Sequence, residues 1–288
     1  MDLKKIEIGV VGAGFVGNAV IKAFEKKYVV NVLDTIEDKC THYCMSSFLN
    51  SSDIIFVCVP TPMGKDGECN TSIVEGIIKE ISENQYYNEQ FIVIKSTVIV
   101  GTTKKLQKQY PNLNLFFNPE FLTEANAVQD YQNQSRVIIG YEKGYASIYD
   151  ATMLRQVFIN VFGKLPYIIT NTKTAEMVKY TTNSYLASKV SFANEINNLC
   201  QLINIDYDEM MGIAQCDKRL GDSHWQVPGP DGYKGYGGTC FPKDLSALTH
   251  YAEGLGLNPL MLKATAETNL EVRLERKSKK SNRQTEKV

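Results

Sequence analysis

The residues from 6 to 34 constrain the fold more than any other part of the sequence. A short β-branched run, 6–11, ends in the glycine turn Gly12-Ala13-Gly14-Phe15-Val16-Gly17, and apolar residues at helical spacing follow this turn. A second apolar run, 29–33, ends at Asp34, twenty residues after Gly14. A strand, a glycine turn, a helix and a second strand closed by an acid predict the start of a βαβ unit with the GxGxxG spacing.

This glycine turn predicts a site for the pyrophosphate of a dinucleotide. Gly12 permits the tight turn, Gly14 lets the backbone approach the pyrophosphate, and Gly17 lets the helix pack closely on the strand. An acid at the end of the second strand accepts hydrogen bonds from ribose hydroxyls and repels a 2′-phosphate, so Asp34 predicts NAD rather than NADP. Lys39 lies nearby and would weaken that preference. A glycine turn without a ligand is the alternative.

The rest of the first half repeats the alternation of strand and helix. Apolar runs at 54–59, 91–94, 115–117, 137–139 and 167–169 are separated by segments of helix-like composition. This alternation predicts an α/β fold, with a Rossmann-like doubly wound parallel sheet covered by helices on both faces. From about residue 172 the helical periodicity continues without a further strand pattern. The sequence therefore predicts an NAD-binding domain over 1–170, an all-helical central domain over 171–275 and a basic, disordered tail over 276–288.

Composition and charge limit the partners and the compartment. The 31 Lys and Arg against 32 Asp and Glu give a formal net charge of −1, so no overall charge favours nucleic acid or an anionic membrane. No apolar run approaches the roughly 18 residues that span a bilayer, and the N-terminus lacks a cleavage-site pattern. Seven scattered cysteines are typical of reduced thiols, and Cys40, His42 and Cys44 lack the spacing of a zinc site. We expect a cytoplasmic protein without a bound metal.

Three polar segments follow predicted strands. Val59-Pro60-Thr61-Pro62, Lys95-Ser96-Thr97 and Asn118-Pro119-Glu120 follow the third, fourth and fifth apolar runs. Because ligands of doubly wound sheets bind at the carboxyl ends of the strands, all three segments are candidates for a site, although each could be a simple turn. Glu120 and Glu124 give two carboxylates at this edge, one of which could activate water.

A cysteine near the C-terminal end lies where a thiolate would be stabilised. In Gly237-Gly238-Thr239-Cys240-Phe241-Pro242-Lys243-Asp244, Cys240 comes just before a predicted helix and close to a lysine. Both the helix N-terminus and the cation favour the ionised thiol, although an inert buried cysteine is the alternative. Lys179 and Asn183 lie one helical turn apart, where they could stabilise an oxyanion or form a solvated polar stripe.

Together these segments resemble the UDP-glucose 6-dehydrogenase family, which also includes GDP-mannose and UDP-N-acetylmannosamine dehydrogenases. The resemblance runs in order through GAGFVG, VPTP, KSTV, NPEFLTE, AEMVKYTTNSYLASKVSFANEI and GYGGTCFPKD, and covers nearly the whole chain. It implies a four-electron oxidation of the C6 hydroxyl of a nucleotide sugar, UDP-glucose to UDP-glucuronate, in polysaccharide biosynthesis with NAD as cofactor. It also implies a homodimer through the long helix. Family members continue into a C-terminal UDP-binding domain, and this sequence is expected to lack it.

The resemblance implies a role for each motif residue. Cys240 is expected to trap the aldehyde as a thiohemiacetal that becomes a thioester. The other expected catalytic residues are Lys179 and Asn183, which stabilise the oxyanion, and Asp244, Glu120 and Thr97, which handle protons and water. The expected NAD-binding residues are Gly12, Gly14, Phe15, Val16, Gly17, Asp34, Lys39, Thr61, Thr97, Glu124 and Lys243. The expected substrate-binding residues are Glu120, Phe121, Leu122, Glu124, Lys179, Asn183, Tyr233, Gly237 and Arg219, the last supplied across the dimer.

Two other hypotheses remain open at the level of the sequence. A chain of this length could be a non-catalytic NAD-binding or assembly subunit, or part of a longer enzyme. A short-chain β-hydroxyacid dehydrogenase would share the NAD domain, the long helix and the Lys-x-x-x-Asn pair, but it has no use for the Gly-Gly-x-Cys-x-Pro-Lys-Asp motif. The segment 223–232 also differs from the shorter loop of the best-known family members, which leaves the sugar open.

Overall fold

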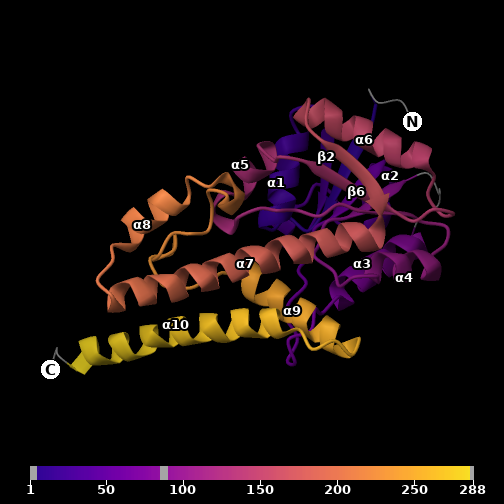
Figure 1. The fold of residues 1–288 in the computed structure, drawn as a ribbon. Helices are drawn as coiled ribbons and strands as arrows, with labels where there is room; N and C mark the ends of the chain where they lie inside the picture. The colour runs from indigo at the N-terminus through magenta and orange to yellow at the C-terminus, as the bar shows by residue number, and fades with distance from the viewer. Residues whose placement is uncertain (1–4, 85–89, 286–288) are drawn as a thin grey trace. The chain divides into compact units, whose positions relative to one another are not determined.

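A computed structural model describes residues 5–84 and 90–285, with side chains up to residue 273 (Figure 1). The chain divides into two compact units. Unit 1 contains Met1–Pro62 and Cys69–Lys179, and unit 2 contains Met63–Glu68 and Tyr180–Val288. The short segment 63–68 belongs to unit 2, where Ser246 Oγ donates a hydrogen bond to the carbonyl oxygen of Gly67 (3.1 Å). The division falls inside a long helix rather than at residue 170.

Unit 1 is built on a seven-stranded sheet in the order β2-β1-β3-β4-β5-β6-β7. The strands are β1 (Glu7–Val11), β2 (Val29–Leu33), β3 (Ile54–Val57), β4 (Phe91–Ile94), β5 (Asn114–Phe117), β6 (Val137–Tyr141) and β7 (Tyr167–Asn171). The first five strands are parallel, which confirms the predicted Rossmann-like fold. The expectation of an all-parallel sheet is wrong at one point, because β6 pairs antiparallel with β5 and β7 runs parallel to β6. The connection between β5 and β6 contains the 3₁₀ helix η2 (Glu124–Asn126) and a six-residue helix, Ala127–Gln132.

Helices cover both faces of this sheet, as predicted. On one face pack α1 (Phe15–Phe24), α5 (Ala127–Gln132) and α6 (Ile148–Phe162). On the other pack α2 (Met45–Asn50), α3 (Ser72–Asn84), α4 (Thr102–Gln109) and the start of α7 (Thr172–Leu202). The central strands serve both faces, since Ile54 and Phe56 of β3 join the first core and Ile55 and Val57 join the second. Burial on both faces explains why these strands are continuous apolar runs rather than alternating patterns.

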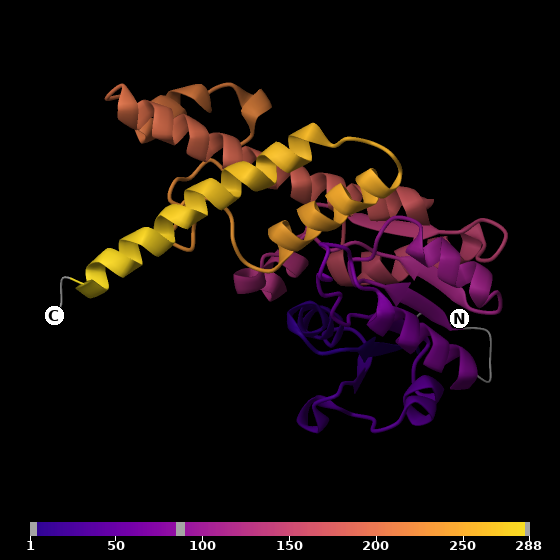
Figure 2. The ribbon, with the colours of Figure 1, turned by 90° about the horizontal axis from the view of Figure 1, so that it is seen from below.

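Unit 2 is helical, as predicted. Besides α7 it contains α8 (Tyr207–Ala214), α9 (Cys240–Gly254) and α10 (Leu260–Thr285), and α9 and α10 lie side by side in both ribbon views (Figure 1 and Figure 2). Helices α7 and α10 are joined by a hydrogen bond between the hydroxyls of Ser188 and Thr265 (2.9 Å). The Ser191 hydroxyl also donates to the carbonyl oxygen of Thr265 (2.9 Å). No helix in the described part of the chain is both long and apolar enough to cross a membrane.

Helix α10 extends into the segment for which the sequence predicts a disordered tail. Its backbone stays helical to Thr285. Residues 286–288, the last three of the predicted tail, lie outside the described residues. The segment contains neither glycine nor proline, the two residue types that most strongly end a helix, and it is rich in lysine and arginine, which have high helix propensity. The disorder of this segment stays a prediction.

A buried carboxylate ties α7 to the N-terminus of α4 within unit 1. Glu176 accepts hydrogen bonds from the backbone N–H groups of Gly101 (2.5 Å) and Thr103 (2.9 Å), which the first turn of a helix leaves without intrahelical partners. The side chain is fully buried. Burial raises the pKa of Glu176 to about 7, and the two backbone hydrogen bonds oppose this shift only in part.

We expect this group to make the stability of the fold depend on pH. Because the pKa of Glu176 in the folded protein, about 7, lies above its ordinary value of 4.5, the folded state holds the proton more tightly. Its stabilisation is fully present below pH 4.5 and is lost as the pH rises through about 7. Urea unfolding should show the free energy of unfolding falling by about 2–3 kcal/mol between about pH 5 and 8. Glu176→Gln should remove this slope, and an unchanged slope would contradict the prediction.

Candidate active site

The glycine turn after β1 has the geometry that the sequence predicts. Gly12 has a φ of +88°, and a Cβ there would lie 2.9 Å from the carbonyl oxygen of Cys58. A Cβ on Gly17 would lie 1.8 Å from the carbonyl oxygen of Gly12. Helix α1 can therefore lie this close to the turn only because residue 17 is glycine. A Cβ on Gly14 would meet no atom within 4 Å. The space beside Gly14 at the N-terminus of α1 is thus open, which fits the pyrophosphate of NAD.

Asp34 closes β2 and also holds the glycine turn. Its carboxylate accepts hydrogen bonds from the backbone N–H groups of Ala13 (2.5 Å) and Ile36 (2.9 Å), while Lys39 Nζ donates to the carbonyl oxygen of Ala13 (3.2 Å). Burial raises the pKa of Asp34, but these two hydrogen bonds and the charge of Lys39 outweigh it, so the pKa lies below its usual value. The carboxylate is therefore ionised at neutral pH, as an acceptor for ribose hydroxyls requires.

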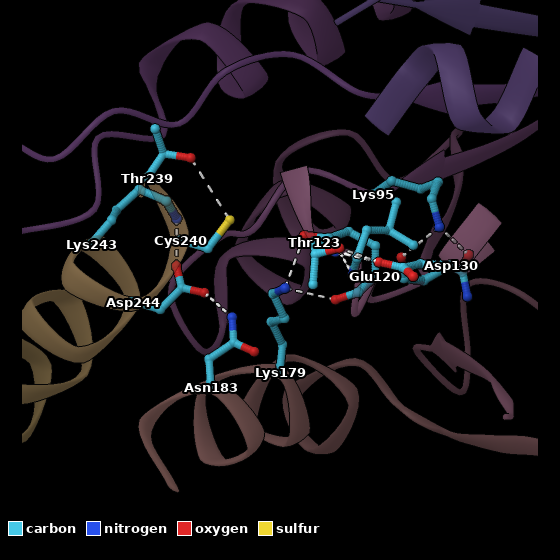
Figure 3. Close-up of polar contacts among 12 residues, drawn as sticks. Lys95, Glu120, Thr123, Asp130, Lys179, Asn183, Thr239, Cys240, Lys243 and Asp244 are labelled. Atoms are coloured by element: carbon cyan, nitrogen blue, oxygen red, sulfur yellow. Dashed lines mark hydrogen bonds and ion pairs between the residues drawn. The ribbon is translucent and has the colours of Figure 1, made fainter. Parts of the chain in front are cut away.

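A buried ion pair lies at the carboxyl edge of the sheet. Lys179 Nζ on α7 donates to Glu120 Oε1 (2.8 Å) and to the carbonyl oxygen of Glu120 (2.6 Å), as Figure 3 shows. Both side chains are almost completely buried, at 2% and 5% exposure. Burial raises the pKa of Glu120, but the charge and hydrogen bond of Lys179 and the N–H of Leu122 lower it overall. Glu120 is therefore an ionised carboxylate, with its oxygens available as acceptors, in a nearly dry environment.

The remaining predicted residues of unit 1 lie along the same edge of the sheet. Thr61 and Thr97 are buried in the segments after β3 and β4. Phe121 and Leu122 follow Glu120, and the Phe121 ring centroid lies 5.6 Å from Lys179 Nζ. Glu124 is exposed at the start of the short 3₁₀ helix η2 (Glu124–Asn126). Parallel strands thus place the separate motifs on one edge, as the sequence predicts.

In unit 2 the predicted residues gather at the N-terminus of α9. Cys240 is the first residue of this helix, and Asp244 lies one turn further on, almost fully buried. Asp244 Oδ2 accepts a hydrogen bond from Asn183 Nδ2 on α7 (2.6 Å), and Oδ1 binds the ammonium of Lys243 (Figure 3). The Cys240 thiol therefore lies at the positive end of a 15-residue helix, an environment that favours a thiolate.

The loop before Cys240 is fixed by residues that the sequence analysis missed. Asn194 Oδ1 on α7 accepts from the N–H of Gly235 (3.0 Å), and Asn269 Oδ1 on α10 accepts from the N–H of Tyr236 (2.7 Å). Arg273 Nε donates to the carbonyl oxygen of Tyr236 (3.0 Å). A Cβ on Gly237 would lie 2.7 Å from Arg273 Nη2, so a larger residue there would have to displace the Arg273 guanidinium. Asparagines within predicted helices were a signal that could have identified two of these anchors, Asn194 and Asn269.

Arg219 and Tyr233 lie on exposed parts of unit 2. Arg219 belongs to the 3₁₀ helix η3 (Lys218–Leu220), its side chain is 89% exposed, and Nε donates to Asp217 (2.9 Å). The loop is held from α7, where Lys189 Nζ donates to the carbonyl oxygen of Leu220 (3.0 Å). Tyr233 lies in the loop before Cys240 with 37% exposure.

The predicted catalytic residues thus form two groups. Glu120 and Lys179 are together in unit 1, and Asn183, Asp244 and Cys240 are together in unit 2. A Rossmann-like sheet with an open glycine turn, followed along the chain by a helical unit that carries a cysteine at a helix N-terminus, indicates the class of dinucleotide-binding proteins.

Comparison with known proteins identifies the family. Residues 39–161 match the NAD binding domain of the UDP-glucose/GDP-mannose dehydrogenase family, and residues 173–271 match the central domain of the same family. The chain therefore belongs to the UDP-glucose/GDP-mannose dehydrogenase family, whose cofactor is NAD. The predicted resemblance, fold and cofactor are confirmed, whereas the roles of individual site residues stay predictions.

Individual relatives agree with this assignment. The chain is 37% identical over 234 residues to UDP-glucose 6-dehydrogenase TuaD of Bacillus subtilis strain 168, which covers 77% of this chain and 47% of that protein. A UDP-glucose dehydrogenase structure from Pyrobaculum islandicum superposes with a TM-score of 0.82 at 25% identity, covering 94% of this chain and 69% of that one. A GDP-mannose dehydrogenase structure from Pseudomonas aeruginosa superposes with a TM-score of 0.66 at 25% identity, covering 92% of this chain and 68% of that one. The chain spans about half the length of the curated relatives it matches.

Proposed function

We propose that the protein oxidises the C6 hydroxyl of a nucleotide sugar, UDP-glucose, to the carboxylate of UDP-glucuronate, with two NAD reduced per sugar. The observation that carries the proposal is Cys240 at the N-terminus of α9, one turn before the buried Asp244. Oxidation of an alcohol to a carbonyl needs no nucleophile, whereas a second oxidation at the same carbon is made possible by covalent capture of the aldehyde. The 37% identity to a UDP-glucose 6-dehydrogenase supports the choice of sugar.

The residues of the first unit would remove protons and hold the cofactor. The glycine turn would hold NAD, which would supply the hydride acceptor for the sugar carbon. Gly14 leaves room for the pyrophosphate, and Asp34 would accept hydrogen bonds from the ribose hydroxyls. Glu120, ionised and almost dry, would accept the proton of the C6 hydroxyl or of the water that later attacks. Thr97 would help to hold this water.

The residues of the second unit, together with Lys179 of the first unit, would carry the covalent step. The Cys240 thiolate would attack the aldehyde carbon, and the resulting thiohemiacetal would become a thioester once it has lost a hydride. Water would then attack the thioester and release the carboxylate and the thiolate. Lys179 and Asn183, four residues apart on α7, would stabilise the oxyanions of these steps, while Asp244 holds the Asn183 amide in place. Arg219, Tyr233 and Gly237 are proposed to contact the nucleotide sugar.

A substrate panel tests this proposal. NADH formation would be followed with UDP-glucose, UDP-N-acetylmannosamine, GDP-mannose and a simple 3-hydroxy acid, and binding of NAD and of each sugar nucleotide would be measured by calorimetry. We expect turnover with UDP-glucose and two NADH per sugar consumed. Binding of NAD without any response to a sugar nucleotide would instead support a non-catalytic NAD-binding subunit. Turnover of the hydroxy acid with Cys240 removed would support a β-hydroxyacid dehydrogenase.

We further propose that the protein acts in the cytoplasm as a homodimer that pairs through α7. All seven cysteines are thiols, which supports a reducing compartment. Tyr185, Phe192 and Leu199 recur every seven residues on α7 and are 62%, 55% and 51% exposed. An apolar stripe at this spacing is typical of a helix that packs on a second helix.

A charge in the middle of this stripe is expected to separate the dimer. Phe192→Glu should weaken dimerisation by at least about 100-fold, because aromatic anchors at the centre of an interface carry most of the binding energy. Light scattering after size exclusion would show half the wild-type mass at micromolar protein. Ile148→Glu serves as the control, since Ile148 is similarly exposed, at 58%, but lies on α6. A Phe192→Glu protein with the wild-type mass would contradict the proposal.

A further inference from the structure

A second lysine is buried next to the carboxylate that we propose as the base. Lys95 follows β4 directly and is 1% exposed. Its ammonium donates a hydrogen bond to Asn118 Oδ1 (2.7 Å) and lies 4.8 Å from the ring centroid of Tyr131. A buried lysine is unusual unless something fixes its charge, because removing an ammonium from water is unfavourable. In the view of Figure 3, Glu120 lies between the side chains of Lys179 and Lys95.

Two buried lysines act on the Glu120 carboxylate. The charges of Lys179 and Lys95 both lower the pKa of Glu120, and that of Lys179 has the larger effect. The nearby Cys58 thiol does not supply a second negative charge, because burial raises its pKa to about 12. Burial also raises the pKa of the Tyr131 hydroxyl well above its usual range. Neither group therefore offsets the charges of Lys95 and Lys179 beside Glu120.

Lys95 is also linked to the backbone that carries Glu120. Asn118, two residues before Glu120, accepts from Lys95 and donates through Nδ2 to the carbonyl oxygen of Ile138 on β6 (2.7 Å). The Asn118 N–H donates to the carbonyl oxygen of Ile94 on β4 (2.9 Å). Asn118 is 2% exposed, so these bonds are made away from water. Lys95 thus fixes one end of the segment whose other end is held by Lys179.

We propose that Lys95 is a positioning residue for Glu120: it fixes the segment after β5 through Asn118, and its charge adds to that of Lys179 in favouring the ionised carboxylate of Glu120. At neutral pH Lys95 carries this charge, because burial lowers its pKa only to about 8. A proton on Glu120 would leave the charges of Lys95 and Lys179 without this carboxylate partner, so the ionised form of Glu120 is favoured. The inference rests on the proposed function only where it calls Glu120 the base.

Titration of Glu120 by NMR tests the proposal without turnover. Glutamate labelled with ¹³C at the carboxyl would be followed in the wild type, Lys95→Met, Lys95→Arg and Lys105→Met, with Glu120→Gln used to assign the signal. We expect Lys95→Met to raise the titration midpoint of Glu120 by about half a pH unit or more. Lys95→Arg should keep this midpoint near the wild-type value, because arginine keeps the positive charge. Lys105→Met should have no effect, since Lys105 is 63% exposed. A folded Lys95→Met protein with the wild-type midpoint would overturn the proposal.

A reciprocal measurement covers the case in which Lys95→Met does not fold. If the charge of Lys95 lowers the proton affinity of Glu120, then the charge of Glu120 must raise that of Lys95 by the same free energy. Lysine labelled with ¹³C at Cε should therefore show a lower midpoint for Lys95 in Glu120→Gln than in the wild type. An unchanged Lys95 midpoint in folded Glu120→Gln would overturn the proposal.

The two proposals can fail separately. Shifted midpoints without turnover of any nucleotide sugar would refute the proposed function and leave the charge relation between Lys95 and Glu120 established. Turnover of UDP-glucose with unshifted midpoints would support the proposed function and refute the charge relation between Lys95 and Glu120. If the protein is active, the acidic limb of the pH profile of kcat should move to higher pH in Lys95→Met. The same limb should stay in place in Lys95→Arg. A residue with only a structural role would lower kcat without moving this limb.

Discussion

Replacement of Cys240 by alanine is expected to abolish formation of the acid. Without the thiol, the aldehyde carbon has no covalent partner, and the second oxidation must proceed without the thioester. We expect steady turnover to UDP-glucuronate to fall by at least about 10⁴-fold, as for other enzymes that lose their nucleophile. The measurement is NADH formation together with product analysis, in which the NADH yield per sugar should drop from two to one at most.

A second cysteine of unit 2 provides the control. Cys216 is exposed and lies outside the motif around α9, so Cys216→Ala should keep turnover within about twofold of the wild type. Calorimetric binding of NAD should be the same in both variants, because the glycine turn belongs to unit 1. Unchanged turnover to the acid in Cys240→Ala would show that the reaction does not pass through this thiol.

The parts of this structure that depend on local sequence could be predicted. The GxGxxG turn needs Gly12 at positive φ and Gly17 in contact with a backbone carbonyl, and only glycine satisfies both. The strands of the sheet centre are buried on both faces and are therefore apolar throughout. Because parallel strands end at one edge, the polar segments after β3, β4 and β5 had to lie on that edge.

Features that depend on pairing between distant segments could not be predicted. An apolar run has the same composition in either direction, so β6 and β7 gave no sign that they run opposite to β5. Glu176 lies in a helical pattern like any other glutamate, and only the fold brings it to the N-terminus of α4. Lys95 was seen only as part of a strand-end motif, because the charge of its neighbours comes from residues far along the chain.

Replacement of Lys179 by methionine is expected to lower the free energy of unfolding by a large amount. Lys179→Met removes the cation from a nearly dry ion pair and leaves the Glu120 carboxylate buried without its closest partner. Breaking a buried pair in this way costs about 3–5 kcal/mol of unfolding free energy, far more than an exposed pair. Urea unfolding at neutral pH measures this loss. Lys105→Met, which breaks the exposed pair with Glu75, is the matched control and should cost at most about 1 kcal/mol.

The pH dependence of this loss identifies its cause. Because Lys179 lowers the pKa of Glu120, the stabilisation from this carboxylate is present above its ordinary value of 4.5 and is lost as the pH falls through the folded value. The wild type and Lys179→Met should therefore differ less in acid, where Glu120 takes up a proton, than at neutral pH. The double variant Glu120→Gln/Lys179→Met removes both charges and should regain at least about half of the loss. A loss that is independent of pH and of Glu120 would instead come from the packing of the lysine side chain.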